Sequence, residues 1–119
     1  IEISLANEAT LGDHATPINL RNGQVYIAEV STKAQIDTAS EIATALTDTN
    51  GLLDAIDIDS GANAILLIGA ADDHTTQFVY GISNDQTSSI TVAEINLMGT
   101  VTTDITNGIQ GLIVDNFVF

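Results

Sequence analysis

The chain has 119 residues, a length that suits one domain, and 45% of them are hydrophobic. That share supplies enough apolar material for a core, so the chain is not a disordered acidic segment. Asp and Glu number 16 against 2 Lys and Arg, which gives a net charge of −14. A surface of this sign repels phosphate, which excludes nucleic acid as a partner and disfavours anionic lipid headgroups.

The absence of cysteine excludes disulfide bonds, thiolate metal sites and cysteine nucleophiles. No apolar run reaches the roughly 18 residues of a membrane-spanning helix, so we expect no membrane insertion. We expect residues 1–119 to form a single domain. Because the first residue is Ile1 and not Met, we expect a processed chain or a fragment of a longer protein.

The first predicted elements are two short strands. Apolar and polar residues alternate over 1–5, which predicts a strand. Asn22-Gly23 predicts a turn, and the run QVYIAEV over 24–30 predicts a second strand after it.

The main predicted helix covers residues 38–49. Thr38 and Glu41 have the spacing of a capping box, and Ile42 and Leu46 lie on one apolar stripe at helical spacing. Asn50-Gly51 would end this helix. The apolar residues around Ile56 then suggest a short second helical turn.

Strands dominate the rest of the chain. The run AILLIGA over 64–70 predicts a central strand, Asp72-Asp73-His74 a turn, and 76–82 the partner strand of a hairpin. Residues 94–101 and 112–119 predict two more strands. The fold class expected is α+β, with a single mainly antiparallel sheet of about five strands and the main helix packed on it.

The residues show no recognisable catalytic pattern, so we expect a protein that is not an enzyme. The sequence has no nucleophile elbow and no glycine-rich phosphate loop. His74 follows Asp72 and Asp73, so an unrecognised hydrolase using these three side chains stays as one alternative.

Calcium is the only cofactor that the residues suggest. Aligned with a twelve-residue calcium loop, the segment 83–94 places Ser83, Asp85 and Thr87 at the first, third and fifth positions and Glu94 at the last. Ser88 stands where such loops carry glycine. The segment reads either as a calcium loop short of charge or as an ordinary loop between strands.

Two further acidic pairs are weaker calcium candidates. Asp57 with Asp59, and Asp72 with Asp73, lie at opposite ends of the apolar strand predicted from residue 64. They would therefore form separate sites.

The second half of the chain resembles a known family. The segment FVYGISNDQTSSITVAEINLMGTV, over 78–101, resembles the region near the C-terminus of repeats-in-toxin exoproteins, in which a calcium-loop-like turn is followed by an acid and a strand. Asp85, Glu94 and the run INLMGT over 95–100 carry this resemblance. The upstream run ANAILLIGAADD is similar in type.

The end of the chain adds to the resemblance. Substrates of type I secretion often end in an acidic residue followed by hydrophobic ones, and this chain ends Asp115-Asn116-Phe117-Val118-Phe119. Asp115, Phe117, Val118 and Phe119 would then form an export signal. The same residues also fit an ordinary last core strand, and the two readings are compatible.

The sequence therefore predicts a non-enzymatic C-terminal module of a secreted bacterial protein. The resemblance implies a type I exporter as partner, an extracellular location, and a role in export or in the structure of the exoprotein. A calcium-dependent adhesion or assembly module is the alternative.

Overall fold

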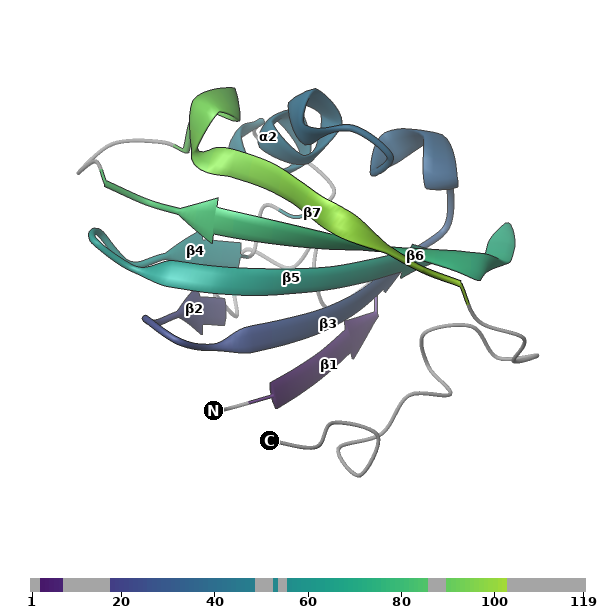
Figure 1. The fold of residues 1–119 in the computed structure, drawn as a ribbon, viewed down its shortest axis with the longest axis horizontal. Coiled ribbons are helices and arrows are strands. Elements are labelled where there is room, and N and C mark those ends of the chain that lie inside the picture. The colour runs from purple at the N-terminus through teal and green to yellow at the C-terminus, as the bar shows by residue number, and fades with distance from the viewer. Residues whose placement is uncertain (1–2, 8–17, 49–52, 54–55, 86–89, 103–119) are drawn as a thin grey trace.

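The computed structural model describes residues 3–7, 18–48, 53, 56–85 and 90–102 (Figure 1). Seven strands alternate with one α-helix and two short 3-10 turns in the described residues. In chain order these are β1 (Ile3–Asn7), β2 (Ile18–Leu20), β3 (Val25–Val30), η1 (Lys33–Gln35), α2 (Ala39–Thr47), β4 (Ile56–Ile58), β5 (Asn63–Ala70), β6 (Asp73–Ser83), η2 (Val92–Glu94) and β7 (Ile95–Thr102).

The strands form a five-stranded sheet in the order β1-β3-β5-β6-β7 and a two-stranded sheet of β2 and β4. β1, β3 and β5 are parallel, whereas β6 and β7 are antiparallel to their neighbours. The α+β class is confirmed, and so is the hairpin of β5 and β6. The expectation of a single sheet is too simple, because β2 and β4 pair in a sheet of their own. The expectation of a mainly antiparallel sheet is wrong, because β1 with β3, and β3 with β5, are parallel, as is β2 with β4.

Local sequence explains where β3 and α2 begin. Gly23 has a φ of +83°, a backbone conformation that favours glycine, in the turn predicted at Asn22-Gly23. Thr38 caps α2, since its hydroxyl oxygen accepts from the Glu41 backbone N–H at 3.2 Å and its O–H donates to the Glu41 carboxylate at 2.9 Å. The predicted N-cap at Thr38 is therefore confirmed, but the Glu41 carboxylate accepts from the Thr38 hydroxyl and not from the backbone N–H that completes a capping box. The helix begins one residue later than predicted, at Ala39.

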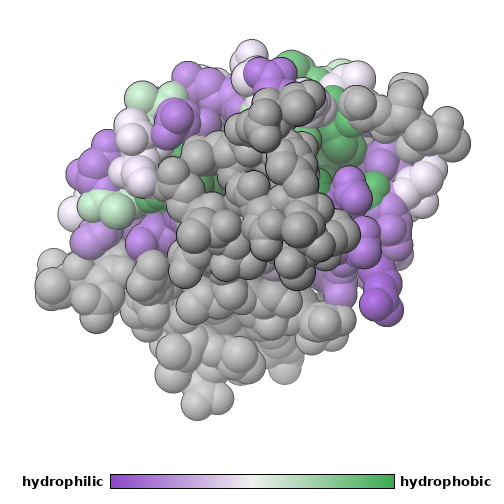
Figure 2. Space-filling view, turned by 180° about the vertical axis from the view of Figure 1, so that it is seen from behind, coloured by the Kyte–Doolittle hydropathy of each residue, from purple (hydrophilic) through white to green (hydrophobic). Residues whose placement is uncertain are grey.

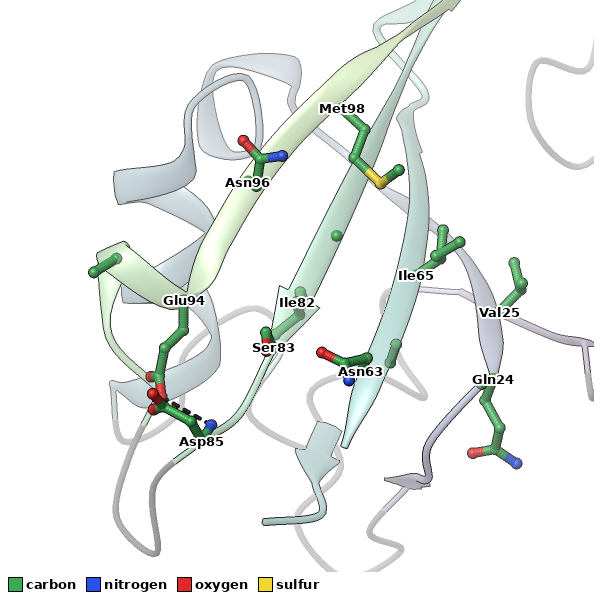
Figure 3. A pocket seen from close by; sticks show the side chains of 14 residues that line it. Gln24, Val25, Asn63, Ile65, Ile82, Ser83, Asp85, Glu94, Asn96 and Met98 are labelled. Atoms are coloured by element: carbon green, nitrogen blue, oxygen red, sulfur yellow. Dashed lines mark hydrogen bonds between the residues drawn. The ribbon is translucent and has the colours of Figure 1, made fainter. Parts of the chain in front are cut away.

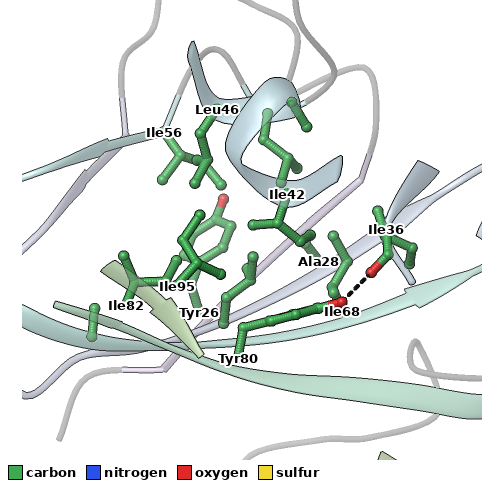
Figure 4. Close-up of a cluster of buried hydrophobic side chains, with 14 of the residues drawn as sticks. Tyr26, Ala28, Ile36, Ile42, Leu46, Ile56, Ile68, Tyr80, Ile82 and Ile95 are labelled. Carbon is green, nitrogen blue, oxygen red and sulfur yellow. Dashed lines mark hydrogen bonds between the residues drawn. The ribbon is translucent and has the colours of Figure 1, made fainter. Parts of the chain in front are cut away.

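The main core lies between α2 and one face of the large sheet (Figure 4). Side chains alternate between the faces of a strand, so Tyr26, Leu66 and Tyr80 point to the side on which Ile42 and Leu46 of α2 pack. The Tyr80 hydroxyl donates to the Ile36 carbonyl oxygen at 2.6 Å, which satisfies a polar group in this core. Phe78, Tyr80 and Ile82, at alternate positions of β6, all lie in this core.

The opposite face of the sheet is also apolar. It carries Ile27 and Leu67, which are buried, and Val25, Ile65 and Val79, which are half-buried. Seen from behind, many of the described residues along the outline of the molecule are hydrophilic (Figure 2). The sheet thus has two apolar faces, of which α2 covers one.

Two local predictions are wrong. Ile56 belongs to strand β4, where it pairs with Ile18, and not to a second helical turn. Asp73 and His74 belong to β6, so the turn between β5 and β6 is shorter than expected and consists of Ala71 and Asp72. The strand predicted over 112–119 lies outside the described residues.

Candidate functional site

A hollow of about 590 Å³ lies on the sheet face opposite to α2 (Figure 3). Its floor follows one row across the sheet, because Val25 pairs with Ile65, Ile65 with Gly81, and Gly81 with Asn96. Paired residues point to the same face, so these positions meet although they are far apart in the sequence. Three of the four floor positions carry no polar side chain.

Gly81 lies on the floor of the hollow beneath the Met98 side chain. A Cβ at this position would lie only 3.0 Å from the sulfur of Met98, so glycine makes room for Met98 to pack over β6. Met98 of β7 leans over the floor from the strand next to Gly81 (Figure 3). The apolar part of the hollow thus includes Val25, Ile65, Gly81 and Met98.

Polar groups surround this floor. Gln24, Asn63, Ser83 and Asn96 contribute amide and hydroxyl groups, and Asp85 and Glu94 contribute carboxylates. An apolar floor with a few polar groups at its margin is the usual composition of a ligand site, and the volume falls within the common range of about 300–1,000 Å³.

The two carboxylates lie together at one end of the hollow (Figure 3). Glu94 accepts from the Thr91 N–H at 2.7 Å, from the Thr91 hydroxyl at 3.1 Å and from the Asp85 N–H at 3.3 Å. These bonds hold the pKa of the Glu94 carboxyl below its usual range, chiefly through the Thr91 N–H. Glu94 therefore keeps its negative charge and also caps η2.

The structure brings together three of the four residues predicted as a calcium loop. Ser83, Asp85 and Glu94 all line the hollow, whereas Thr87 lies outside the described residues. The helix-loop-helix setting of such loops is absent here, because the segment 83–94 starts at the last residue of β6 and ends with the short η2, directly before β7. Both Glu94 carboxylate oxygens accept protein hydrogen bonds, so a cation at this end would have to compete with them or share these oxygens.

The other acidic pairs lie apart from the hollow. Asp57 is in β4 and Asp59 directly follows it, before the start of β5, while Asp72 and Asp73 come after its end. This agrees with the prediction that they are separate. Within the described part of the chain, no three His, Asp or Glu side chains gather as a metal-binding group.

Lys33 binds both acids of the second pair. Its backbone N–H donates to Asp72 at 2.9 Å and its ammonium group lies 2.8 Å from Asp73. The ammonium group lowers the pKa of the Asp73 carboxyl, and the bond to Asp73 raises the pKa of Lys33. A carboxyl with so low a pKa is a poor proton donor near neutral pH.

His74 is half-buried at the start of β6, and its carbonyl accepts from the Gln77 side chain at 2.9 Å. None of Asp72, Asp73 and His74 lines the hollow. The three residues of the hydrolase alternative therefore do not share that site with Asp85 and Glu94.

The sequence alone did not identify the apolar half of the hollow. Val25, Ile65 and Met98 read as ordinary strand residues, and Gly81 as one glycine within a strand. A glycine inside an apolar strand was the one available signal, since it often marks a close approach or an open space.

The predicted export residues Asp115, Phe117, Val118 and Phe119 lie outside the described residues. No helix in the described part of the chain has the length and apolar character needed to cross a bilayer. Comparisons of this chain with protein-family models, with curated proteins and with solved structures find no match.

Proposed function

We propose that this chain is a non-enzymatic C-terminal module of a secreted bacterial protein, and that it acts by binding a ligand or partner in the hollow between β3 and β7. The observation that carries the proposal is the hollow itself, with its apolar floor around Gly81 and its polar margin. Adhesion of the exoprotein, or its assembly, is the role that such a surface supports.

The chemistry of the margin favours binding over catalysis. Glu94 is ionised and occupied by three hydrogen bonds to its neighbours, so it suits neither proton donation nor attack on a substrate. Among the described residues that line the hollow there is no histidine and no lysine.

The first test introduces a side chain at Gly81, on the floor of the hollow. Gly81→Val places a branched side chain against Met98, whereas the matched change Gly99→Val enters open space on β7, since nothing lies within 4 Å of a side chain added there. Binding of the neutral apolar dye Nile red, followed by fluorescence, is expected to weaken roughly tenfold, or about 1.4 kcal/mol, in Gly81→Val only. Absence of dye binding to the unaltered chain, or equal binding to both variants, would overturn the proposal.

A calcium-dependent module is the second candidate, and the closeness of Asp85 and Glu94 favours it. Calorimetric titration with calcium chloride would then show binding and a higher melting temperature. Asp85→Asn and Glu94→Gln should abolish both effects, whereas Asp57→Asn, an exposed acid on β4, should leave them unchanged. Heat of binding that survives both substitutions in the loop would place calcium elsewhere.

Export through a type I system remains the role proposed for residues 115–119. The measurement is secretion of a reporter fused to the full chain, compared with a fusion that lacks Asp115 to Phe119. Retention of the shortened fusion in the cell is expected, and unchanged secretion would disprove the signal.

A further inference from the structure

β7 is an outer strand of the large sheet. In the described part of the chain it pairs only with β6, and every residue from Asn96 to Thr102 is exposed. The outer edge of such a strand presents alternate N–H and C=O groups that can pair with another extended segment.

The β7 edge lacks two of the features by which proteins usually prevent such pairing. Its sequence, INLMGTVT, contains no charged residue and no proline. The strand is eight residues long. Its pairing with β6 has one irregularity: Leu97 pairs with Tyr80 and Gly99 with Val79, which leaves Met98 as an extra residue between the two pairs. The stretch from Gly99 to Thr102 continues without interruption.

Exposed apolar side chains gather at the same edge. Among the described residues the large hydrophobic side chains with the greatest exposure are Val92 at 50%, Leu97 at 42%, Met98 at 59% and Val101 at 39%. Val92 lies in η2 and the other three lie in β7. Alternate side chains of an added strand would find apolar neighbours on both faces of the sheet.

The charge around this edge is negative. α2 lies against β7 and η2 and carries Glu41 and the capping Asp48, while Asp85 and Glu94 lie beside the start of β7. α2, η2 and β7 contain no lysine or arginine. The sequence has two cationic residues, Lys33 and Arg21. Lys33 forms an ion pair with Asp73. Arg21 lies before β3, and β5 and β6 separate β3 from β7.

We propose that the β7 edge accepts an extended segment of another protein, in which β-branched or aliphatic residues alternate with lysine or arginine. Backbone pairing with β7 supplies the affinity, and the acidic margin selects a basic partner. A second copy of this chain is a poor occupant, because each copy carries a net charge of −14. This surface is the backbone edge of β7 and does not depend on a ligand in the hollow.

The direct test is amide hydrogen exchange of the full chain by NMR, with the synthetic peptides KVTVKVTVK and EVTVEVTVE as probes. We expect the basic peptide to protect alternate amides of β7, those that face outward, and the acidic peptide to need at least a tenfold higher concentration. Equal protection by both peptides would overturn the charge selection. Peptide-induced changes confined to residues of the hollow, or none at all, would overturn the edge proposal.

The same experiment also detects two other possible partners of the β7 edge, a segment of the same chain and a second copy. Outward amides already protected in the free chain at every concentration would mean that the chain covers its own edge. Protection that disappears on dilution would mean a second copy. Either result overturns the proposal.

Two adjacent proline substitutions provide a second test. In a strand, neighbouring N–H groups point to opposite sides, so one of Thr100→Pro and Val101→Pro loses an outward N–H and the other loses a bond to β6. The outward one is expected to keep the wild-type circular dichroism spectrum and to bind KVTVKVTVK at least tenfold more weakly. A folded variant of this kind that binds the peptide as the unaltered chain does would contradict strand addition.

Discussion

At the scale of single residues, Tyr80 connects the sheet to the segment that leads into α2. Its ring is fully buried among the core side chains, and its hydroxyl donates to the Ile36 carbonyl, which is distant in the sequence (Figure 4). Burial, together with the nearby charges of Asp37 and Glu41, raises the pKa of Tyr80 to about 12. The neutral phenol is therefore the form that the fold requires.

We expect Tyr80→Phe to lower the free energy of unfolding by about 1–3 kcal/mol at neutral pH, because the buried Ile36 carbonyl loses its donor. Urea unfolding followed by circular dichroism measures this loss. A change within the error of the measurement would show that the carbonyl finds another donor.

Tyr80 also predicts a dependence on alkaline pH. A raised pKa in the folded state means that the stabilisation is complete below the unfolded pKa of about 10 and is lost as pH rises through about 12. Tyr26 contributes to the same decline, since burial raises its pKa as well. Between pH 10 and 12, Tyr80→Phe should therefore lose stability less steeply than the unaltered chain, and an identical slope would contradict this assignment.

At the scale of elements, the start of α2 depends on one cap. Thr38→Ala removes the acceptor for the Glu41 N–H and should destabilise the protein by about 1 kcal/mol. Thr44→Ala is the matched control, because Thr44 is exposed within the same helix and alanine is a better helix former there. Urea midpoints of the two variants test the cap, and equal loss in both would argue against it.

Asn84, directly after β6, connects the two sheets. The buried side chain of Asn84 donates to the Ile58 carbonyl in β4 at 2.6 Å, and its backbone N–H donates to Ala62 at 2.9 Å. Asn84→Ala leaves the Ile58 carbonyl without this donor and should cost about 1–3 kcal/mol in urea unfolding. Asn96→Ala, at an exposed position of β7, should cost little by comparison.

At the scale of the whole molecule, electrostatic repulsion destabilises the folded state. A net charge of −14 on a chain of this size repels itself, and salt reduces the repulsion as the screening length falls from about 30 Å at 0.01 M to about 3 Å at 1 M. We expect the melting temperature to rise with sodium chloride. An uncharged solute such as sucrose at matched osmolarity separates this effect from solvent exclusion, and a melting temperature insensitive to salt would contradict it.

Several elements could be predicted from the sequence because their signals are local. Thr38 and Glu41 form a cap within one helical turn, Asn22-Gly23 forms a turn within two residues, and the apolar run from Ala64 makes a buried strand wherever it pairs. The alternation that placed Phe78 and Tyr80 on one face is likewise a property of the strand itself.

Pairing between distant strands was not predictable in the same way. β4 has three residues, too few for a periodic signal, and its partner β2 lies more than 30 residues earlier, so the second sheet had no local signature. For that reason the sequence around Ile56 predicts a helical turn and not a strand. The parallel register of β3 with β5 likewise depends on how the chain crosses over, which α2 and its connections decide.

The sequence by itself determined the charge, the absence of cysteine chemistry, the cap of α2 and the alternation within the strands. Each follows from a residue and its near neighbours. Only the tertiary structure decided that Gly81 accommodates the Met98 side chain, that Glu94 is held by Thr91 and Asp85, and that β7 is an outer strand. The physical reason is that hollows and edges arise from the order and register of strands, and register is set by packing against residues far away in the chain.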